Sequence, residues 1–137
     1  MCVLTPPFDP CVPLRMVSGF GLTEKQMLAT DLRFVKLPLV DQKTCNDFVN
    51  NARSARPDDA IYRYTENMFC AGFPEGGKDS CTGDSGGAFA FKKDGRYWAA
   101  GIVSWGVGCG EPGYYGVYTR VSKYTDWINR IMDNQCK

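Results

Sequence analysis

The 137-residue chain is predicted to fold as one all-β domain. About six short apolar segments are separated by turn-forming residues, and few segments have the apolar spacing of a helix. This pattern favours a β-barrel or a β-sandwich. A chain of this length can also bury a hydrophobic core of its own.

The strands are predicted from alternating or continuous apolar runs. Within residues 32–40, apolar side chains recur at every second position from Val35, and Pro38 marks an edge strand or a strand end. The Asp94-Gly95 step between two apolar runs predicts a hairpin. In chain order, the expected strands cover residues 16–21, 32–40, 68–71, 88–91, 97–104 and 115–121.

A short helix is expected in the middle of the chain. Asp41 can cap its start, and Cys45, Phe48 and Val49 follow at i, i+3 and i+4. Residues 50–64 are polar and have no period, so we expect them to form an exposed loop.

A second helix is expected at the C-terminal end, with Ser122 as its N-cap. Its apolar stripe has the spacing i, i+3, i+4, i+7 and is expected to pack against the core rather than to bind a ligand. The stripe consists of Tyr124, Trp127, Ile128 and Ile131. Residues 1–15 have no periodicity and are expected to form an irregular lead-in to the domain at 16–137.

Charge and hydropathy exclude two classes of partner. The net charge of +1 does not suggest binding to nucleic acid. No apolar run approaches the ~20 residues that a membrane-spanning helix needs, so no membrane partner is expected.

The chain contains seven cysteines, Cys2, Cys11, Cys45, Cys70, Cys81, Cys109 and Cys136, and no histidine. No Cys-x-x-Cys pair is present, so a zinc site is not expected, and disulfides formed in an oxidising compartment explain the cysteines better. An odd number leaves at least one cysteine free or bonded to another chain. The first ten residues do not resemble a signal peptide. Secreted-type cysteines without a signal peptide lead to the expectation that the chain is part of a longer protein.

One serine stands out as a candidate nucleophile. It is Ser85, within the run DSCTGDSGG at residues 79–87. Gly83, Gly86 and Gly87 allow a tight turn that can present a hydroxyl and aim backbone N–H groups at one point. Gly, Asp and Ser are also ordinary turn residues, but so many of them beside a cysteine and before an apolar strand favour a catalytic turn.

The run also satisfies the Gly-x-Ser-x-Gly pattern of the α/β-hydrolase nucleophile elbow. That elbow requires a helix directly after the serine and a histidine later in the chain. Residues 88–91 are expected to form a strand and no histidine follows, so this alternative fails.

The residues around Ser85 resemble the active-serine motif of chymotrypsin-like (trypsin-fold) serine proteases. Four further segments match motifs of that family in the expected order: MVSGFG at 16–21, SWG at 104–106, GVYTRV at 116–121 and YTDWI at 124–128. The details at residues 18–21, 67–72 and 87–89 are most similar to the complement first-component proteases and the mannose-binding-lectin-associated serine proteases. The resemblance implies the C-terminal, six-stranded Greek-key β-barrel of the fold, with a short intermediate helix and a C-terminal helix.

The resemblance also implies the catalytic roles. Ser85 would be the nucleophile, and the N–H groups of Gly83 and Ser85 would form the oxyanion hole. Asp79 would lie at the base of the pocket for the side chain before the cut, which implies a preference for Arg or Lys. The further substrate-binding residues are Ser104, Trp105, Gly106 and Gly116: the two glycines keep the pocket open, and 104–106 pair with the substrate backbone.

Pairings and partners follow from the same resemblance. Cys45 would bond to Cys70, and Cys81 to Cys109. Cys2 lies where these proteases link the catalytic chain to a regulatory chain, whereas Cys11 and Cys136 receive no role. A secreted endopeptidase with a protein substrate, no metal and no cofactor is implied.

The chain departs from the family pattern in its catalytic base. The family's histidine and supporting aspartate lie in a first barrel that precedes residue 16, so the chain alone is expected to be inactive. Asp84 would lack the N-terminal partner that it has in the family, and the Ser85 pocket would be disordered or resemble an inactive precursor. Three hypotheses follow: the C-terminal half of a complement-type protease, a non-catalytic binding half-domain of the same fold, and an unrelated disulfide scaffold.

Overall fold

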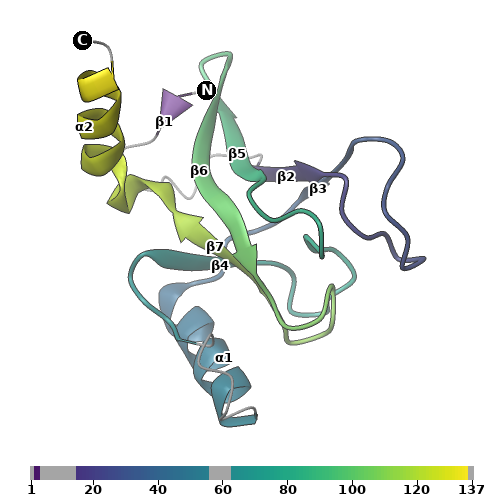
Figure 1. Ribbon diagram of the computed structural model, residues 1–137. Coiled ribbons are helices and arrows are strands. Elements are labelled where there is room, and N and C mark those ends of the chain that lie inside the picture. The colour runs from purple at the N-terminus through teal and green to yellow at the C-terminus, as the bar shows by residue number, and fades with distance from the viewer. Residues whose placement is uncertain (1, 4–14, 56–62, 136–137) are drawn as a thin grey trace.

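The computed structural model describes residues 2–3, 15–55 and 63–135 of the chain. Six antiparallel strands form the sheet in the order β3-β2-β5-β6-β7-β4 (Figure 1). They are β2 (Arg15–Gly19), β3 (Arg33–Lys36), β4 (Met68–Ala71), β5 (Ala88–Lys93), β6 (Arg96–Trp105) and β7 (Gly116–Arg120). The predicted all-β class with two helices is confirmed. Cys11 and Cys136, to which the sequence assigned no role, lie outside the described residues.

A seventh strand comes from the segment expected to be irregular. β1 (Cys2–Val3) pairs in parallel with β6, opposite Trp98 and Ala99. The lead-in is therefore irregular at most in part, because its first residues add to the sheet and Arg15 already belongs to β2.

The sheet closes through an irregular segment after β3. The Val40 N–H donates to Cys70 O at 3.0 Å, and the Gly72 N–H donates to Pro38 O at 3.0 Å. A single bridge joins Leu39 to Ala71 between them. The strand expected over 32–40 therefore ends at Lys36, before Pro38, and the residues that follow pair with β4 instead.

The core of the sheet is a cluster of three aromatic rings. Phe89 and Tyr118 are fully buried, and Phe69 is almost so. The ring centroid of Phe89 lies 5.1 Å from that of Phe69 and 4.9 Å from that of Tyr118. Gly101 of β6 must lack a side chain, because a Cβ there would lie 2.5 Å from the Phe69 ring. The alternation of large and absent side chains thus lets the strands pack closely.

α1 (Gln42–Ala55) begins as predicted but is longer. Asp41 caps it, since its carboxylate accepts hydrogen bonds from the N–H and the hydroxyl of Thr44, and these bonds lower the pKa of Asp41. Ala52 is buried and extends the stripe begun at Cys45 by another turn. The prediction of a short helix and of a loop from residue 50 is wrong for 50–55, because polar residues on one face do not end a helix.

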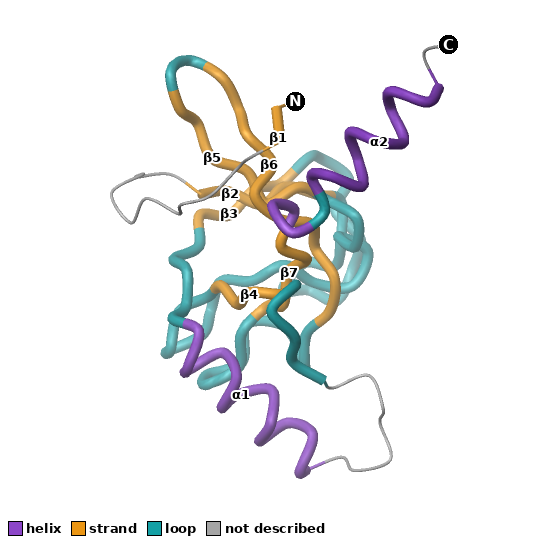
Figure 2. The backbone as a smooth tube through the Cα atoms, turned by 90° about the vertical axis from the view of Figure 1, so that its left-hand side faces the viewer, coloured by secondary structure: helices purple, strands orange, loops and turns teal. Residues whose placement is uncertain are grey.

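The C-terminal helix differs from the prediction in its start and in its packing. Ser122 lies within a 3-10 turn, η1 (Val121–Lys123), and α2 (Thr125–Gln135) begins after it. The Thr125 hydroxyl donates to Ser122 O. Within the described residues the apolar stripe is not core: Trp127 is 55% exposed, and Ile131 is also exposed. α1 and α2 extend from opposite ends of the sheet (Figures 1 and 2). No described helix has the length and apolar character needed to cross a membrane.

Two disulfides join distant parts of the chain, and both have the pairings that the resemblance implies. Cys45 bonds to Cys70 with Cα atoms 5.5 Å apart, and Cys81 bonds to Cys109 with Cα atoms 5.3 Å apart. The first fixes α1 to β4 and lies in the second apolar cluster with Phe48, Val49 and Tyr115.

Removal of the Cys45–Cys70 disulfide is expected to destabilise the chain. Replacing both cysteines by alanine should lower the free energy of unfolding by roughly 3 kcal/mol, because an unfolded loop of this length gains entropy when the bond is lost. Urea unfolding followed by circular dichroism measures the change. Asn46→Ala on the same helix is the control, and a loss below about 1 kcal/mol would contradict the expectation.

Candidate active site

The loop of residues 79–87 lies between β4 and β5 and is fastened to β6. The Gly86 N–H donates to Val103 O at 3.0 Å, and the Val103 N–H donates to Gly87 O at 2.9 Å. Gly83 and Gly86 have φ values of 95° and 84°, which favour glycine. The turn predicted around Ser85 is therefore present, and glycine is required at two of its positions.

The five consecutive backbone N–H groups from residue 83 to 87 divide into two sets. Those of Asp84, Gly86 and Gly87 donate to the carbonyl oxygens of other residues. In the described part of the chain, the N–H groups of Gly83 and Ser85 make no hydrogen bond. The two available donors are thus the two predicted to form an oxyanion hole.

Ser85 itself is exposed on this turn. Its hydroxyl makes no hydrogen bond with any described residue, and the 137 residues contain no histidine that could act as its base. The hydroxyl is exposed, and among residues 2–3, 15–55 and 63–135 no side chain is hydrogen-bonded to it as a base would be.

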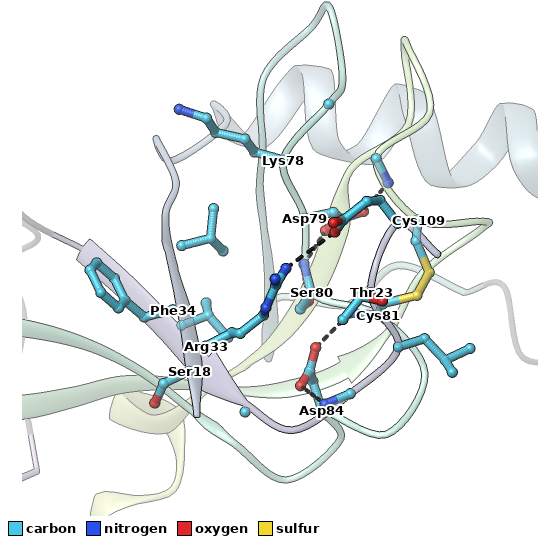
Figure 3. Close-up of a pocket in the computed structure, with 18 of the residues that line it drawn as sticks. Ser18, Thr23, Arg33, Phe34, Lys78, Asp79, Ser80, Cys81, Asp84 and Cys109 are labelled. Carbon is cyan, nitrogen blue, oxygen red and sulfur yellow. Dashed lines mark hydrogen bonds and ion pairs between the residues drawn. A yellow bond between two sulfur atoms is a disulfide. The ribbon is translucent and has the colours of Figure 1, made fainter. Parts of the chain in front are cut away.

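The Asp84 carboxylate is hydrogen-bonded on both oxygens, which corrects the expectation that it is unpaired. Oδ1 accepts from the Gly21 N–H at 2.8 Å, and Oδ2 accepts from the Cys81 N–H at 2.9 Å (Figure 3). Charge-assisted bonds from backbone N–H groups offset the cost of partly burying a carboxylate. The turn before Ser85 is consequently well defined.

Asp79 lies at the edge of a cavity of about 310 Å³ (Figure 3). Its carboxylate accepts hydrogen bonds from the Ser80 N–H at 2.8 Å and the Gly110 N–H at 3.0 Å. Burial raises the pKa of Asp79, the two N–H groups lower it, and the negative charge of nearby Asp84 raises it further. A cation entering the cavity would meet a carboxylate whose ionised form is poorly solvated.

The structure brings Asp79 together with one of the two predicted pocket glycines. A Cβ on buried Gly116 would lie 2.9 Å from Asp79 Oδ1, so this carboxylate needs a glycine at 116. A Cβ on Gly106 would meet nothing closer than 3.8 Å, so this position is open.

The cavity of Figure 3 is not lined by Ser85, Gly106 or Gly116. It reaches Asp79 and Asp84 from the side of β2 and the segment after it. An ion pair between Arg33 and Glu24, with N and O atoms 3.2 Å apart, lies across this side.

The remaining predicted binding residues lie at the junction of β6 and β7. Ser104 is exposed, and Trp105 stands opposite Val117 after an irregularity in the strand pairing. Gly106 follows at the surface. The three residues form an accessible end of β6, and the preceding Val103 is hydrogen-bonded to Gly86 and Gly87 of the serine loop.

Two site residues were missed in the sequence. The Ser80 hydroxyl and the Tyr118 hydroxyl are hydrogen-bonded at 2.9 Å, beside Asp79. Tyr118 is fully buried, and burial raises its pKa far above the ordinary value. Two signals could have indicated them: Ser80 directly follows Asp79, and Tyr118 lies two residues after Gly116 and hence on the same face of β7.

Comparison with known proteins identifies the family. Residues 8–128 match the model of the family described as Trypsin. The chain belongs to the trypsin family. Within that family, it is 47% identical over 121 residues to complement C1r-A subcomponent of Mus musculus, which covers 87% of this chain and 16% of that protein.

Two further relatives agree with this assignment. Complement C1s-1 subcomponent of Mus musculus is 47% identical over 121 residues, covering 85% of this chain and 17% of the relative. A calcium-dependent serine proteinase of Mesocricetus auratus is 45% identical over 123 residues, covering 87% and 17%. The chain thus spans about a sixth of the length of these curated relatives and is closely related to complement proteases within the trypsin family.

Proposed function

We propose that the chain supplies the nucleophile, the oxyanion hole and the specificity pocket of a serine endopeptidase that cleaves after Arg or Lys. The observation that carries the proposal is the pair of available N–H groups at Gly83 and Ser85 on either side of the bonded Asp84. A turn that uses its other amides internally and leaves these two beside a serine hydroxyl suits the stabilisation of an oxyanion.

In the proposed reaction, Ser85 Oγ bonds to the carbonyl carbon of the scissile peptide. Its proton passes to a histidine base on a first barrel that these 137 residues do not contain. The carbonyl oxygen becomes negative and accepts hydrogen bonds from Gly83 and Ser85. The amine then leaves with the proton, and water hydrolyses the acyl-enzyme.

Specificity for Arg or Lys rests on Asp79. Its carboxylate is partly buried beside Gly116 and the paired hydroxyls of Ser80 and Tyr118. A guanidinium or ammonium group would compensate a buried negative charge that the two N–H groups satisfy only in part. Ser104, Trp105 and Gly106 would pair with the substrate backbone, and Gly106 would leave room for a long side chain.

A role in complement activation outside the cell is supported by the relatives that carry complement in their names. The two disulfides suit an oxidising compartment. The proposed partners are a protein substrate, the first barrel and a regulatory chain bonded through Cys2.

A second candidate is a non-catalytic binding half-domain of the same fold. The absence of histidine from the 137 residues favours it. The retention of Ser85, Asp79, Gly106 and Gly116 together favours the enzyme, because a domain that only binds does not need the nucleophile.

Labelling by a fluorophosphonate probe separates the two candidates. The 137-residue chain is expected to stay unlabelled, because Ser85 lacks a base, whereas a chain extended by a histidine-bearing first barrel should be labelled at Ser85. Mass spectrometry of the labelled peptide gives the position, and Ser85→Ala in the extended chain is the control. Labelling of the short chain would disprove its inactivity, and an unreactive extended chain would favour the binding half-domain.

A further inference from the structure

The backbone at Gly21 and Leu22, far from Ser85 in sequence, is hydrogen-bonded to the turn that would form the oxyanion hole. The Leu22 N–H donates to Thr82 O at 2.8 Å. The neighbouring Gly21 N–H donates to Asp84 Oδ1 at 2.8 Å across a separation of 63 residues. Two consecutive backbone amides are therefore hydrogen-bonded to the residues before and after Gly83.

The bond to Thr82 determines where the Gly83 N–H points. A trans peptide unit is planar, and its C=O and N–H groups point in opposite directions. Because Thr82 O is held towards Leu22, the Gly83 N–H must point away from Leu22. Reversal of this peptide would break the Leu22 bond and turn a carbonyl oxygen towards the place where the oxyanion would form.

These two hydrogen bonds require a close approach of the two backbone segments, which leaves no room for a side chain at the glycines involved. A Cβ on buried Gly21 would lie 2.5 Å from Asp84 Cγ, and a Cβ on Gly83 would lie 3.1 Å from Gly21 Cα. The segment is itself braced, because the Ala29 N–H donates to Gly21 O at 3.1 Å and the Thr23 N–H donates to Met27 O at 2.8 Å. The two amides are thus presented by a folded turn, not by a free loop.

We propose that Gly21 and Leu22 are positioning residues of the oxyanion hole, acting through their backbone N–H groups on Thr82 and Asp84. The inference rests on the proposed function, since it needs Gly83 to serve as an oxyanion donor. It assigns the Gly83 orientation to a contact between the end of β2 and the serine loop. Neither residue touches substrate in this role.

The first measurement uses the 137-residue chain and requires no catalysis. A scalar coupling by NMR between the Leu22 amide nitrogen and the Thr82 carbonyl carbon is expected, because the hydrogen bond is short. Absence of this coupling in the folded chain would overturn the proposal.

The second measurement uses the chain extended by the first barrel. Leu22→Pro removes the N–H, and replacement of Leu22 by its α-hydroxy acid removes it while keeping the side chain, in case the proline variant does not fold. Leu22→Ala, which keeps the N–H, is the matched control. We expect kcat to fall at least about tenfold, towards the roughly 10²–10³-fold cost of losing an oxyanion donor. The inhibition constant of benzamidine, which reports on the Asp79 pocket, should change less than about twofold.

The outcomes separate this proposal from the proposed function. An unchanged kcat in the N–H-deleted variants, or an equal loss in the alanine control or in benzamidine binding, would overturn the positioning role. Failure of the unmodified extended chain to cleave or to react with fluorophosphonate would instead overturn the proposed function, and the coupling measurement would still test the Leu22 contact.

Discussion

Replacing Asp79 by asparagine is expected to lower kcat/KM for Arg and Lys substrates by roughly 10²–10⁴ in the chain extended by a first barrel. The substrate cation would lose its buried carboxylate partner, and breaking a buried pair in this way costs about 3–5 kcal/mol. Cleavage after Leu or Phe should change little, so the measurement is the ratio of kcat/KM for matched Arg and Leu peptides. Asp133→Asn, on the exposed face of α2, is the control. An unchanged ratio would show that Asp79 does not contact the substrate.

The same variant should have the opposite effect on folding. Because burial raises the pKa of Asp79 above its ordinary 3.8, the folded chain keeps this proton at pH values where the unfolded chain has lost it. The resulting contribution to the free energy of unfolding is present below the unfolded pKa and is lost as pH rises through the folded pKa. Asp79→Asn should remove this decline, and the variant should be more stable than the parent at neutral pH. Urea unfolding across the acidic range measures the difference.

Truncation of Phe89 to alanine should have the largest effect on stability, with a loss of about 3–5 kcal/mol in the free energy of unfolding. Its ring is 0% exposed and contacts both Phe69 and Tyr118. Removal of the ring leaves a cavity that the side chains of β4 and β7 cannot fill. Chemical denaturation of the chain measures the loss.

Phe34→Ala is the matched control for this core substitution. Phe34 is the same residue type on the neighbouring part of the sheet but is 64% exposed, so its loss should cost less than about 1 kcal/mol. Similar losses at the two positions would mean that the aromatic cluster is not the stability core of this chain.

The strands could be predicted because each has one face towards the core. Phe89 and Phe91 of β5 are buried while Lys92 is exposed, and such alternation appears directly in the sequence. The end of α1 could not be predicted in this way, because a polar run can either continue a helix or form a loop. Trp127 is exposed, so the apolar stripe of a helix did not by itself indicate which part of the protein the helix packs against.

The side chains of the candidate site were easier to predict than its backbone. The serine turn could be predicted because so many Gly, Asp and Ser residues stand together beside a cysteine and before an apolar strand. The contacts of Gly21 and Leu22 with the turn were not apparent, since amide groups are the same in every residue and only the fold brings them to Asp84 and Thr82. The pairing of Ser80 with Tyr118 likewise depends on which strands become neighbours.

The closure of the sheet has a consequence for how the chain opens. Leu39 and Ala71 form a single bridge flanked by two hydrogen bonds, whereas β4 pairs with β7 at four positions and β5 pairs with β6 at six. Among the described strand pairs around the barrel, this seam has the fewest paired positions, and the Cys45–Cys70 disulfide joins α1 to β4 beside it. Reduction of the Cys45–Cys70 disulfide would remove this crosslink. The first structural fluctuation would then be separation of the Leu39–Ala71 bridge, which opens the barrel into a sheet with the serine loop still attached to β6.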